Sequence, residues 1–264
     1  MLMIRHAPAV LLGAAAALYV RERRRRLRLE RLGAATLETL LDAIDANNYD
    51  TGEHVRRVAR YALILADAAD LDDKTQRSIE RVALFHDIGK IDGALHDIIN
   101  ETTRLTPVER RSIMTHPQRG ADVLRPLSAF YPDLAEGVLC HHEKWDGTGY
   151  PRHLKGSRIP LTARIVAVAD TFDAITHRRS YSHARSIKIA TSVIAEGRAT
   201  QFDPDFVDLF LSPPVMDRVL SAMREAYKPK RAKKTRRGRA ETQGVPDLTF
   251  RWRTPAPARQ PAGQ

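Results

Sequence analysis

The sequence predicts an all-α protein. Apolar residues recur at helical spacing along most of the central chain, and no segment alternates apolar and polar residues as a half-buried strand would. A chain of 264 residues is long enough to bury one sizeable core and still leave tails. We expect an apolar and Arg-rich segment over residues 1–30, one helical domain over residues 31–227, and a basic, Pro-rich disordered tail over residues 228–264.

Local signals mark several helix ends in the central domain. Thr51 is expected to cap a helix, Gly89 to end one, and Thr106, Pro107 and Glu109 to open another as a capping box with Pro at the first helical position. Regularly spaced apolar residues predict a long buried helix near residue 170. The predicted helices cover residues 53–69, 79–88, 106–116, 134–143, 161–175, 187–196, 206–211 and 215–227.

The N-terminal segment carries an apolar run followed by arginines. Residues 7–20 are uncharged, and as a helix they would extend about 21 Å, against a bilayer core of about 30 Å. The "RERRRR" that follows favours the cytoplasmic side. We expect a short membrane anchor that holds a cytoplasmic domain at the inner face of the plasma membrane; the alternative is a buried or peripheral helix. Residues 21–47 are a candidate stalk for a homodimer.

The formal net charge of +11 comes from two segments. Residues 228–239 hold eight Lys or Arg and no acid, and residues 21–28 hold six Arg against one Glu, so the rest of the chain is close to neutral. No aromatic residue interrupts the C-terminal charge run, which argues against a specific nucleic-acid reader and favours a solvated tail. The single cysteine, Cys140, excludes an intrachain disulfide and fits a reducing compartment.

A set of histidines and carboxylates is not explained by helix packing. In "FHDIGK", His86 and Asp87 project about 100° apart on a helix, so the two side chains can hold one ion from two directions while the carboxylate reaches a second. Asp170 lies in an apolar run, where a carboxylate must be paired or coordinating. The set comprises His54, His86, Asp87, His116, His141, His142 and Asp170. It predicts a polynuclear site for a divalent metal, with iron, manganese and zinc all admissible.

The stretches "TGEHVRRVARY", "FHDIGK", "THPQRG", "HHEKWDGTGYP" and "RIVAVADTFDAIT" occur in this order and resemble the HD-GYP family over residues 37–211. This family is a branch of the HD-domain metal-dependent phosphohydrolases. The resemblance implies an HD-type helical bundle with a GYP loop and extra C-terminal helices. It also implies a centre of two or three divalent ions, with iron or manganese expected ahead of other metals, and hydrolysis of cyclic di-GMP to pGpG or GMP.

The resemblance assigns the metal ligands in two sets joined by Asp87. The first set is His54, His86, Asp87 and Asp170; the second ion is held by His116, His141 and His142, with Asp87 bridging. Asp50 stands where a three-metal subgroup has Glu, so it is either a ligand of a third ion or a turn-forming residue beside Gly52. Lys90 would polarise the phosphate or assist the leaving oxygen.

The resemblance also assigns a substrate side. Gly149, Tyr150 and Pro151 would form a wall of the cleft and a contact for a signalling protein partner, and Arg179 would grip a phosphate of cyclic di-GMP.

Two positions depart from the family pattern, which usually reads Arg-Pro-Tyr followed by a basic residue. Ser180 and Ser182 stand in place of the Pro and of the second phosphate-binding cation, for which Arg178 or Arg185 is a candidate substitute.

The expected chemistry is attack by a hydroxide that bridges two ions about 3.5 to 4 Å apart. One alternative is a catalytically weak module that binds cyclic di-GMP and signals through a partner. The other is an HD hydrolase of another signalling nucleotide.

Overall fold

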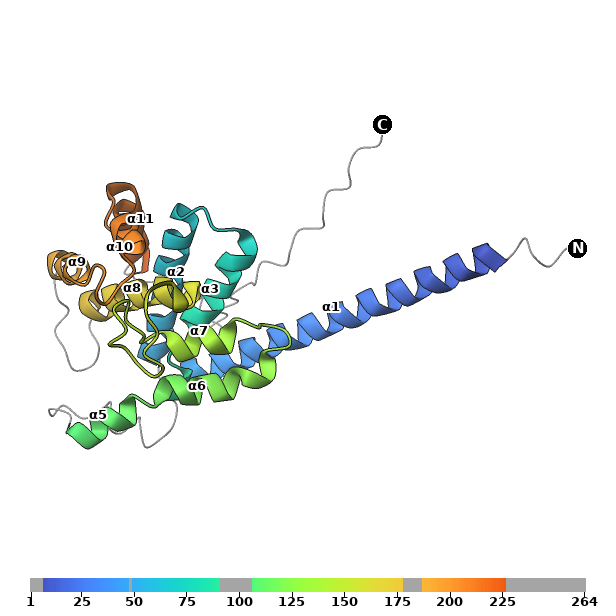
Figure 1. Ribbon diagram of the computed structural model, residues 1–264, viewed down its shortest axis with the longest axis horizontal. Coiled ribbons are helices and arrows are strands. Elements are labelled where there is room, and N and C mark those ends of the chain that lie inside the picture. The colour runs from blue at the N-terminus through green and yellow to red at the C-terminus, as the bar shows by residue number, and fades with distance from the viewer. Residues whose placement is uncertain (1–6, 48, 91–105, 178–186, 227–264) are drawn as a thin grey trace, which may run out of the picture. The chain divides into compact units, whose positions relative to one another are not determined.

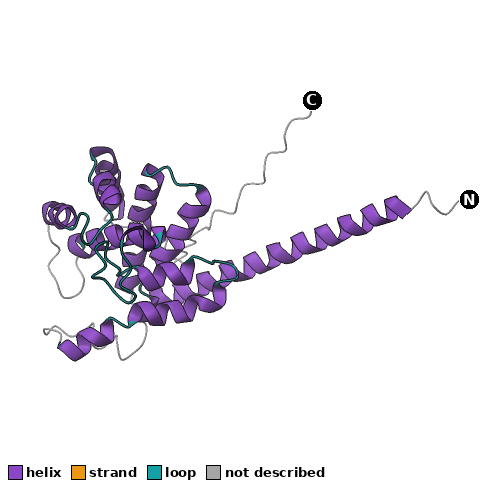
Figure 2. Cartoon of the chain, viewed as in Figure 1, coloured by secondary structure: helices purple, strands orange, loops and turns teal. Residues whose placement is uncertain are grey.

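A computed structural model describes residues 7–47, 49–90, 106–177 and 187–226. Side chains are described from residue 18 onward within these ranges, except at residues 26, 27, 47, 49, 50 and 226. The described chain is helical and contains no named strand; its only β feature is an isolated bridge between Arg198 and Phe202 (Figure 2). The all-α prediction is confirmed. The basic tail predicted at residues 228–264 lies outside the described residues.

The described helices follow one another in the order shown in Figure 1. The α-helices are α1 (Ala7–Asn47), α2 (Tyr49–Ala68), α3 (Asp73–Phe85), α5 (Pro107–Ile113), α6 (His116–Leu124), α7 (Leu134–Cys140), α8 (Leu161–Thr176), α9 (Ile187–Glu196), α10 (Pro204–Phe210) and α11 (Pro213–Ala226). Three short 3-10 turns, η1 (Ile88–Lys90), η2 (Arg125–Leu127) and η3 (Gly156–Arg158), lie between them.

Several helix boundaries differ from the predicted ones. Helix α2 already begins at Tyr49, so Thr51 lies inside it and is not its cap. Helix α3 begins at Asp73, because the side chain of Asp72 accepts a hydrogen bond from the backbone N–H of Thr75 and caps the helix. The second predicted helix therefore starts too late.

The capping box at the start of α5 is confirmed. Thr106 and Glu109 exchange side-chain to backbone hydrogen bonds, and Pro107 occupies the first turn. The helix ends at Ile113, and a separate helix, α6, which the sequence did not predict, begins at His116.

The core lies where α2, α3 and α8 pack together. The ring of Phe172 on α8 meets Tyr61 of α2 and Phe210 of α10 edge to face, with ring centroids 5.5 and 5.4 Å apart, and all three residues are fully buried. Phe85, at the end of α3, is equally buried. This packing fixes the end of α3 against α2 and α8, which positions the polar residues that follow it.

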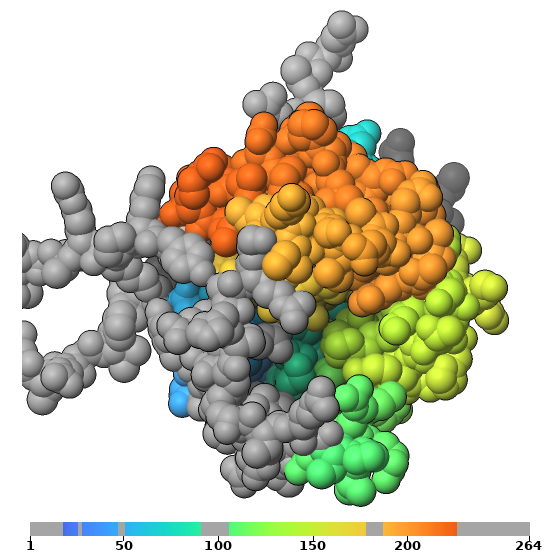
Figure 3. Space-filling model, turned by 90° about the vertical axis from the view of Figure 1, so that its left-hand side faces the viewer, coloured from blue at the N-terminus to red at the C-terminus, as the bar shows by residue number. Residues whose placement is uncertain are grey.

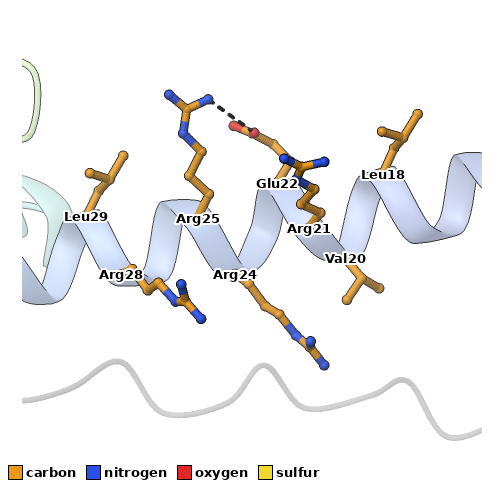
Figure 4. A pocket seen from close by; sticks show the side chains of 8 residues that line it. All are labelled: Leu18, Val20, Arg21, Glu22, Arg24, Arg25, Arg28 and Leu29. Atoms are coloured by element: carbon orange, nitrogen blue, oxygen red, sulfur yellow. Dashed lines mark ion pairs between the residues drawn. The ribbon is translucent and has the colours of Figure 1, made fainter.

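Helix α1 is continuous from the apolar run through the arginines to Asn47. Its last turns bury Leu37, Leu41 and Ile44 against the domain, whereas Leu18 is 65% exposed. In Figure 4 the arginine side chains leave the helix in several directions, and Arg25 pairs with Glu22 at 4.0 Å.

None of the described helices combines the length and the apolar character that crossing a bilayer requires. The anchor expected at residues 7–20 is therefore not supported, because the apolar run ends at Arg21 within the same helix.

Candidate metal centre

Five histidines and three aspartates from distant parts of the chain meet beside the core. They come from α2, the junction of α3 and η1, the start of α6, the end of α7, and α8. In the space-filling view of Figure 3, the teal chain at the end of α3 is recessed between yellow-orange segments on one side and green segments on the other. Most of these side chains are buried, and His142 and Asp170 are partly buried.

Three of the histidines lie at helix ends and are oriented by their own backbone. In each, the ring Nδ1–H donates to the carbonyl oxygen three residues earlier, which fixes the tautomer and leaves Nε2 free to act as a ligand. The pairs are His86 with Ala83 at 2.8 Å, His116 with Ile113 at 2.7 Å and His141 with Val138 at 2.6 Å.

The ligand atoms fall into two groups. In the first, the Nε2 atoms of His54 and His86 lie 3.2 and 3.7 Å from Asp170 Oδ1. In the second, His116 Nε2 lies 3.2 Å from His141 Nε2, and the His142 ring lies beside both of these imidazoles. Within each group of three the ligand atoms lie within 4.8 Å of one another.

Asp87 stands between the two groups and turns one oxygen toward each. Its Oδ2 lies 3.5 Å from His86 Nε2 and 4.0 Å from His54 Nε2, while its Oδ1 lies 3.3 Å from His116 Nε2 and 3.9 Å from His141 Nε2. A carboxylate in this position can link an ion in one group to an ion in the other.

The charges of the centre suit cation binding. Burial works to raise the pKa of Asp87, but Lys90, 2.7 Å from Oδ2, together with His86 and His116, outweighs it and holds that pKa well below its usual range. Burial, followed by the neighbouring histidines, lowers the pKa of His141 well below 6.5 and that of His142 to about 3. The centre therefore combines an ionised carboxylate with two imidazoles, His141 and His142, whose surroundings favour the neutral form.

These residues fit a divalent metal ion. His86 Nε2 is buried and makes no hydrogen bond, although buried polar atoms are nearly always paired. The Nε2 atoms of His116 and His141 face each other at 3.2 Å while both Nδ1 atoms donate to carbonyls, so two lone pairs oppose each other. A cation between them would satisfy both, and imidazole with carboxylate is a common donor set for divalent metals.

The GYP loop lies against the second group. The Tyr150 ring stacks on His142, with centroids 4.9 Å apart, and Tyr150 N–H donates to the His142 carbonyl. Gly149 is required by close packing, since a Cβ there would lie 2.2 Å from the backbone nitrogen of Lys144. Pro151 is exposed at the end of this turn.

Three further predicted residues complete the set. Lys90 lies in η1, beyond the end of α3 at Phe85, and its Nζ pairs with Asp87 Oδ2 at 2.7 Å. Asp50 lies in the first turn of α2, but its side chain is outside the described residues, and so is the whole of Arg179.

Sequence reasoning missed two buried carboxylates. Asp173, 1% exposed, holds His54, Arg57 and His177, and its spacing of three residues from Asp170 on one helix was the available signal. Glu143 accepts the backbone N–H groups that follow the GYP turn, and nothing in the local pattern marked it as buried.

Comparisons with known proteins identify the family of this chain. The family model described as "HD domain" matches residues 38–206. Two curated relatives from Vibrio cholerae are a "Probable cyclic di-GMP phosphodiesterase", 34% identical over 203 residues, and a "3'3'-cGAMP-specific phosphodiesterase 3", 36% identical over 178 residues. The alignments cover 71% and 66% of this chain but 46% and 38% of the relatives, so the chain spans less than half the length of either.

A solved structure with a similar fold is the HD domain of the phosphodiesterase PgpH from L. monocytogenes in complex with cyclic-di-AMP. Its TM-score is 0.51 at 19% identity, and the alignment covers 73% of this chain and 98% of that one. The matched family model, the relatives and the ordered motifs place this chain in the HD-domain family, within its HD-GYP branch.

Proposed function

We propose that this chain is a metal-dependent phosphodiesterase that hydrolyses cyclic di-GMP to pGpG, GMP or both. The observation that carries the proposal is the placement of Asp87, whose two oxygens face two separate groups of three ligands. A single metal site would need only one of these groups. Two groups joined by one carboxylate are what a two-ion phosphodiester hydrolase requires.

Different residues of the chain hold the ions and contact the substrate. When bound, divalent ions supply an activated water and neutralise charge on the phosphate. The neutral His141 and His142 hold cations without cancelling their charge, so an anionic phosphodiester is attracted to the centre. Lys90, partly exposed beside Asp87, is placed to steady a phosphate oxygen or the leaving oxygen.

The donor set suggests which metals bind. Imidazole with a small number of carboxylates suits iron, manganese and zinc, and we propose iron or manganese. Two ions correspond to the two groups of ligands, and a third would need a carboxylate at Asp50 beside His54.

A second substrate is favoured by a specific observation. Relatives at 36% and 33% identity carry the name 3'3'-cGAMP-specific phosphodiesterase. Both substrates are cyclic dinucleotides with two phosphodiester bonds, so the same metal centre serves either. A purine-binding surface must decide between them, and the segment that holds Arg179 lies outside the described residues.

The test is turnover of cyclic di-GMP and 3'3'-cGAMP by the full chain with added Mn²⁺ or Fe²⁺, with the products separated by chromatography. Asp87→Ala should abolish hydrolysis, because it removes the link between the two ligand groups. Asp122→Ala, at an exposed ion pair with Arg125 on α6, is the matched control and should hydrolyse at the wild-type rate. Equal rates for wild type and Asp87→Ala, or no turnover of either nucleotide by the wild type, would refute the proposal.

A further inference from the structure

Asp173 joins three donors in the core behind the metal centre. Its Oδ2 accepts from His54 Nδ1–H at 2.7 Å, and Arg57 donates to both of its oxygens at 2.8 and 3.0 Å. His177 Nδ1 lies 2.9 Å from Oδ1. The carboxylate is 1% exposed, so nearly all of its hydrogen-bonding capacity is spent on these groups.

His54 differs from the other histidines in what orients its ring. His86, His116 and His141 each use a backbone carbonyl at a helix end, three residues earlier. His54 lies inside α2, where the helix's own N–H groups occupy the neighbouring carbonyls. Its Nδ1–H therefore needs an acceptor from elsewhere, and Asp173 supplies it from α8, 119 residues away in sequence.

The contact determines what His54 presents to the centre. A carboxylate is only an acceptor when ionised, so Nδ1 must carry the proton and Nε2 must carry the lone pair. That lone pair is directed toward Asp170, 3.2 Å away, and Asp87, 4.0 Å away. A carboxylate behind a ligating imidazole also raises its basicity as a ligand.

We propose that Asp173, fixed by Arg57 and His177, is a positioning residue that holds His54 as a ligand for the ion in the group His54, His86 and Asp170. The inference rests on the proposed function, because it assumes that this group binds a divalent metal. It predicts an effect confined to one of the two groups. The group His116, His141 and His142 has no contact with Asp173 among the described hydrogen bonds and ion pairs, so its ion should be retained.

The experiment measures Mn²⁺ binding rather than turnover. The full chain is stripped with a chelator and titrated with Mn²⁺ alone, and bound metal is counted by elemental analysis. Asp173→Asn keeps the size of the side chain but cannot accept from Arg57 and His54 on both sides. Losing such a partner of a metal ligand typically weakens binding 10- to 100-fold. We expect one class of Mn²⁺ site to weaken by that factor and the other to be unchanged.

Asp203→Asn is the matched control. Asp203 is also a buried aspartate, 4% exposed and paired with Arg164 at 2.6 Å, and it caps α10 and lies outside the ligand groups of the metal centre. The control should lower thermal stability in the chelator-treated protein and leave both Mn²⁺ affinities at wild-type values. If Asp173 were only structural, Asp173→Asn would behave in the same way.

A second variant decides the matter should Asp173→Asn fail to fold. Arg57→Lys keeps the charge beside Asp173 but loses the two-pronged contact, and Arg57 is partly exposed, so the site can accommodate the change. We expect a smaller weakening of the same Mn²⁺ class. Wild-type Mn²⁺ affinity in Arg57→Lys, or in a folded Asp173→Asn, would overturn this inference and leave the proposed function standing. A wild-type protein that binds no Mn²⁺ would overturn the proposed function as well.

Discussion

The metal-free protein should lose stability as the pH falls from about 6.5 toward 4, and His141 and His142 should be the cause. Both have a folded-state pKa below the ordinary value of 6.5, to about 3 for His142, because burial and the neighbouring histidines disfavour the charged form. Below pH 6.5 these two histidines bind protons in the unfolded chain but stay neutral in the folded protein, where they are buried. Stability is therefore complete above that pH and declines as the pH drops toward the folded-state pKa.

His86, Asp87 and Asp170 do not produce this slope. Burial works to lower the pKa of His86, but Asp87 and Asp170 outweigh it and raise that pKa, so His86 does not resist protonation as the pH falls. Asp87 and Asp170 have pKa values well below 3.8, so their contribution is lost only at lower pH. His141 and His142 each account for one proton, and each proton is worth about 1.4 kcal/mol of stability per pH unit. Over two pH units the upper limit is about 5 kcal/mol, comparable with the whole stability of a small domain.

The assay is denaturant unfolding in a chelator, followed by circular dichroism at about pH 7, 6 and 5. His142→Gln removes one of the two protons and should reduce the slope by about 1.4 kcal/mol per pH unit. His153→Asn, at an exposed position with φ 54° that Asn readily adopts, is the control and should keep the wild-type slope. A slope in His142→Gln equal to that of the wild type would refute the reasoning.

Two further predictions concern the GYP loop. Gly149→Ala places a methyl group 2.2 Å from the backbone nitrogen of Lys144, which no rotamer change can relieve, so we expect a loss of about 1–3 kcal/mol in unfolding free energy, measured by denaturant titration. Glu143→Gln weakens a buried carboxylate that accepts the backbone N–H groups of Arg152 and Leu154 at 2.7 and 3.0 Å. The free energy of unfolding should fall by about 1.5–3 kcal/mol, because one of the two donors then faces an amide N–H. KM for the cyclic dinucleotide should rise while Mn²⁺ affinity stays unchanged. A wild-type KM would contradict the role given to the loop.

The helical class and most residues of the buried cluster could be predicted, because their signals are local. The spacing of Leu161, Ile165 and Val168 predicts α8, and the capping box at Thr106 places the start of α5. A boundary was wrong where the deciding contact lay outside the apolar pattern, as at α3, which starts at Asp73 because Asp72 caps it. The apolar run at residues 7–20 predicted a short anchor, which is not supported because the described helix that contains it is not long and apolar enough to cross a bilayer.

The sequence alone determined that five histidines and two aspartates had to be accounted for, since adjacent imidazoles and a carboxylate in an apolar helix are costly without partners. Local sequence also determines how the rings of His86, His116 and His141 are oriented, because their hydrogen-bond acceptors lie three residues earlier in the same chain segment. The resemblance implied that Asp87 joins two sets of ligands, and only the tertiary structure gave the distances from its two oxygens to each group. The tertiary structure alone also decided that His54 is oriented by Asp173, because a contact across 119 residues depends on how α2 packs against α8 and leaves no local pattern.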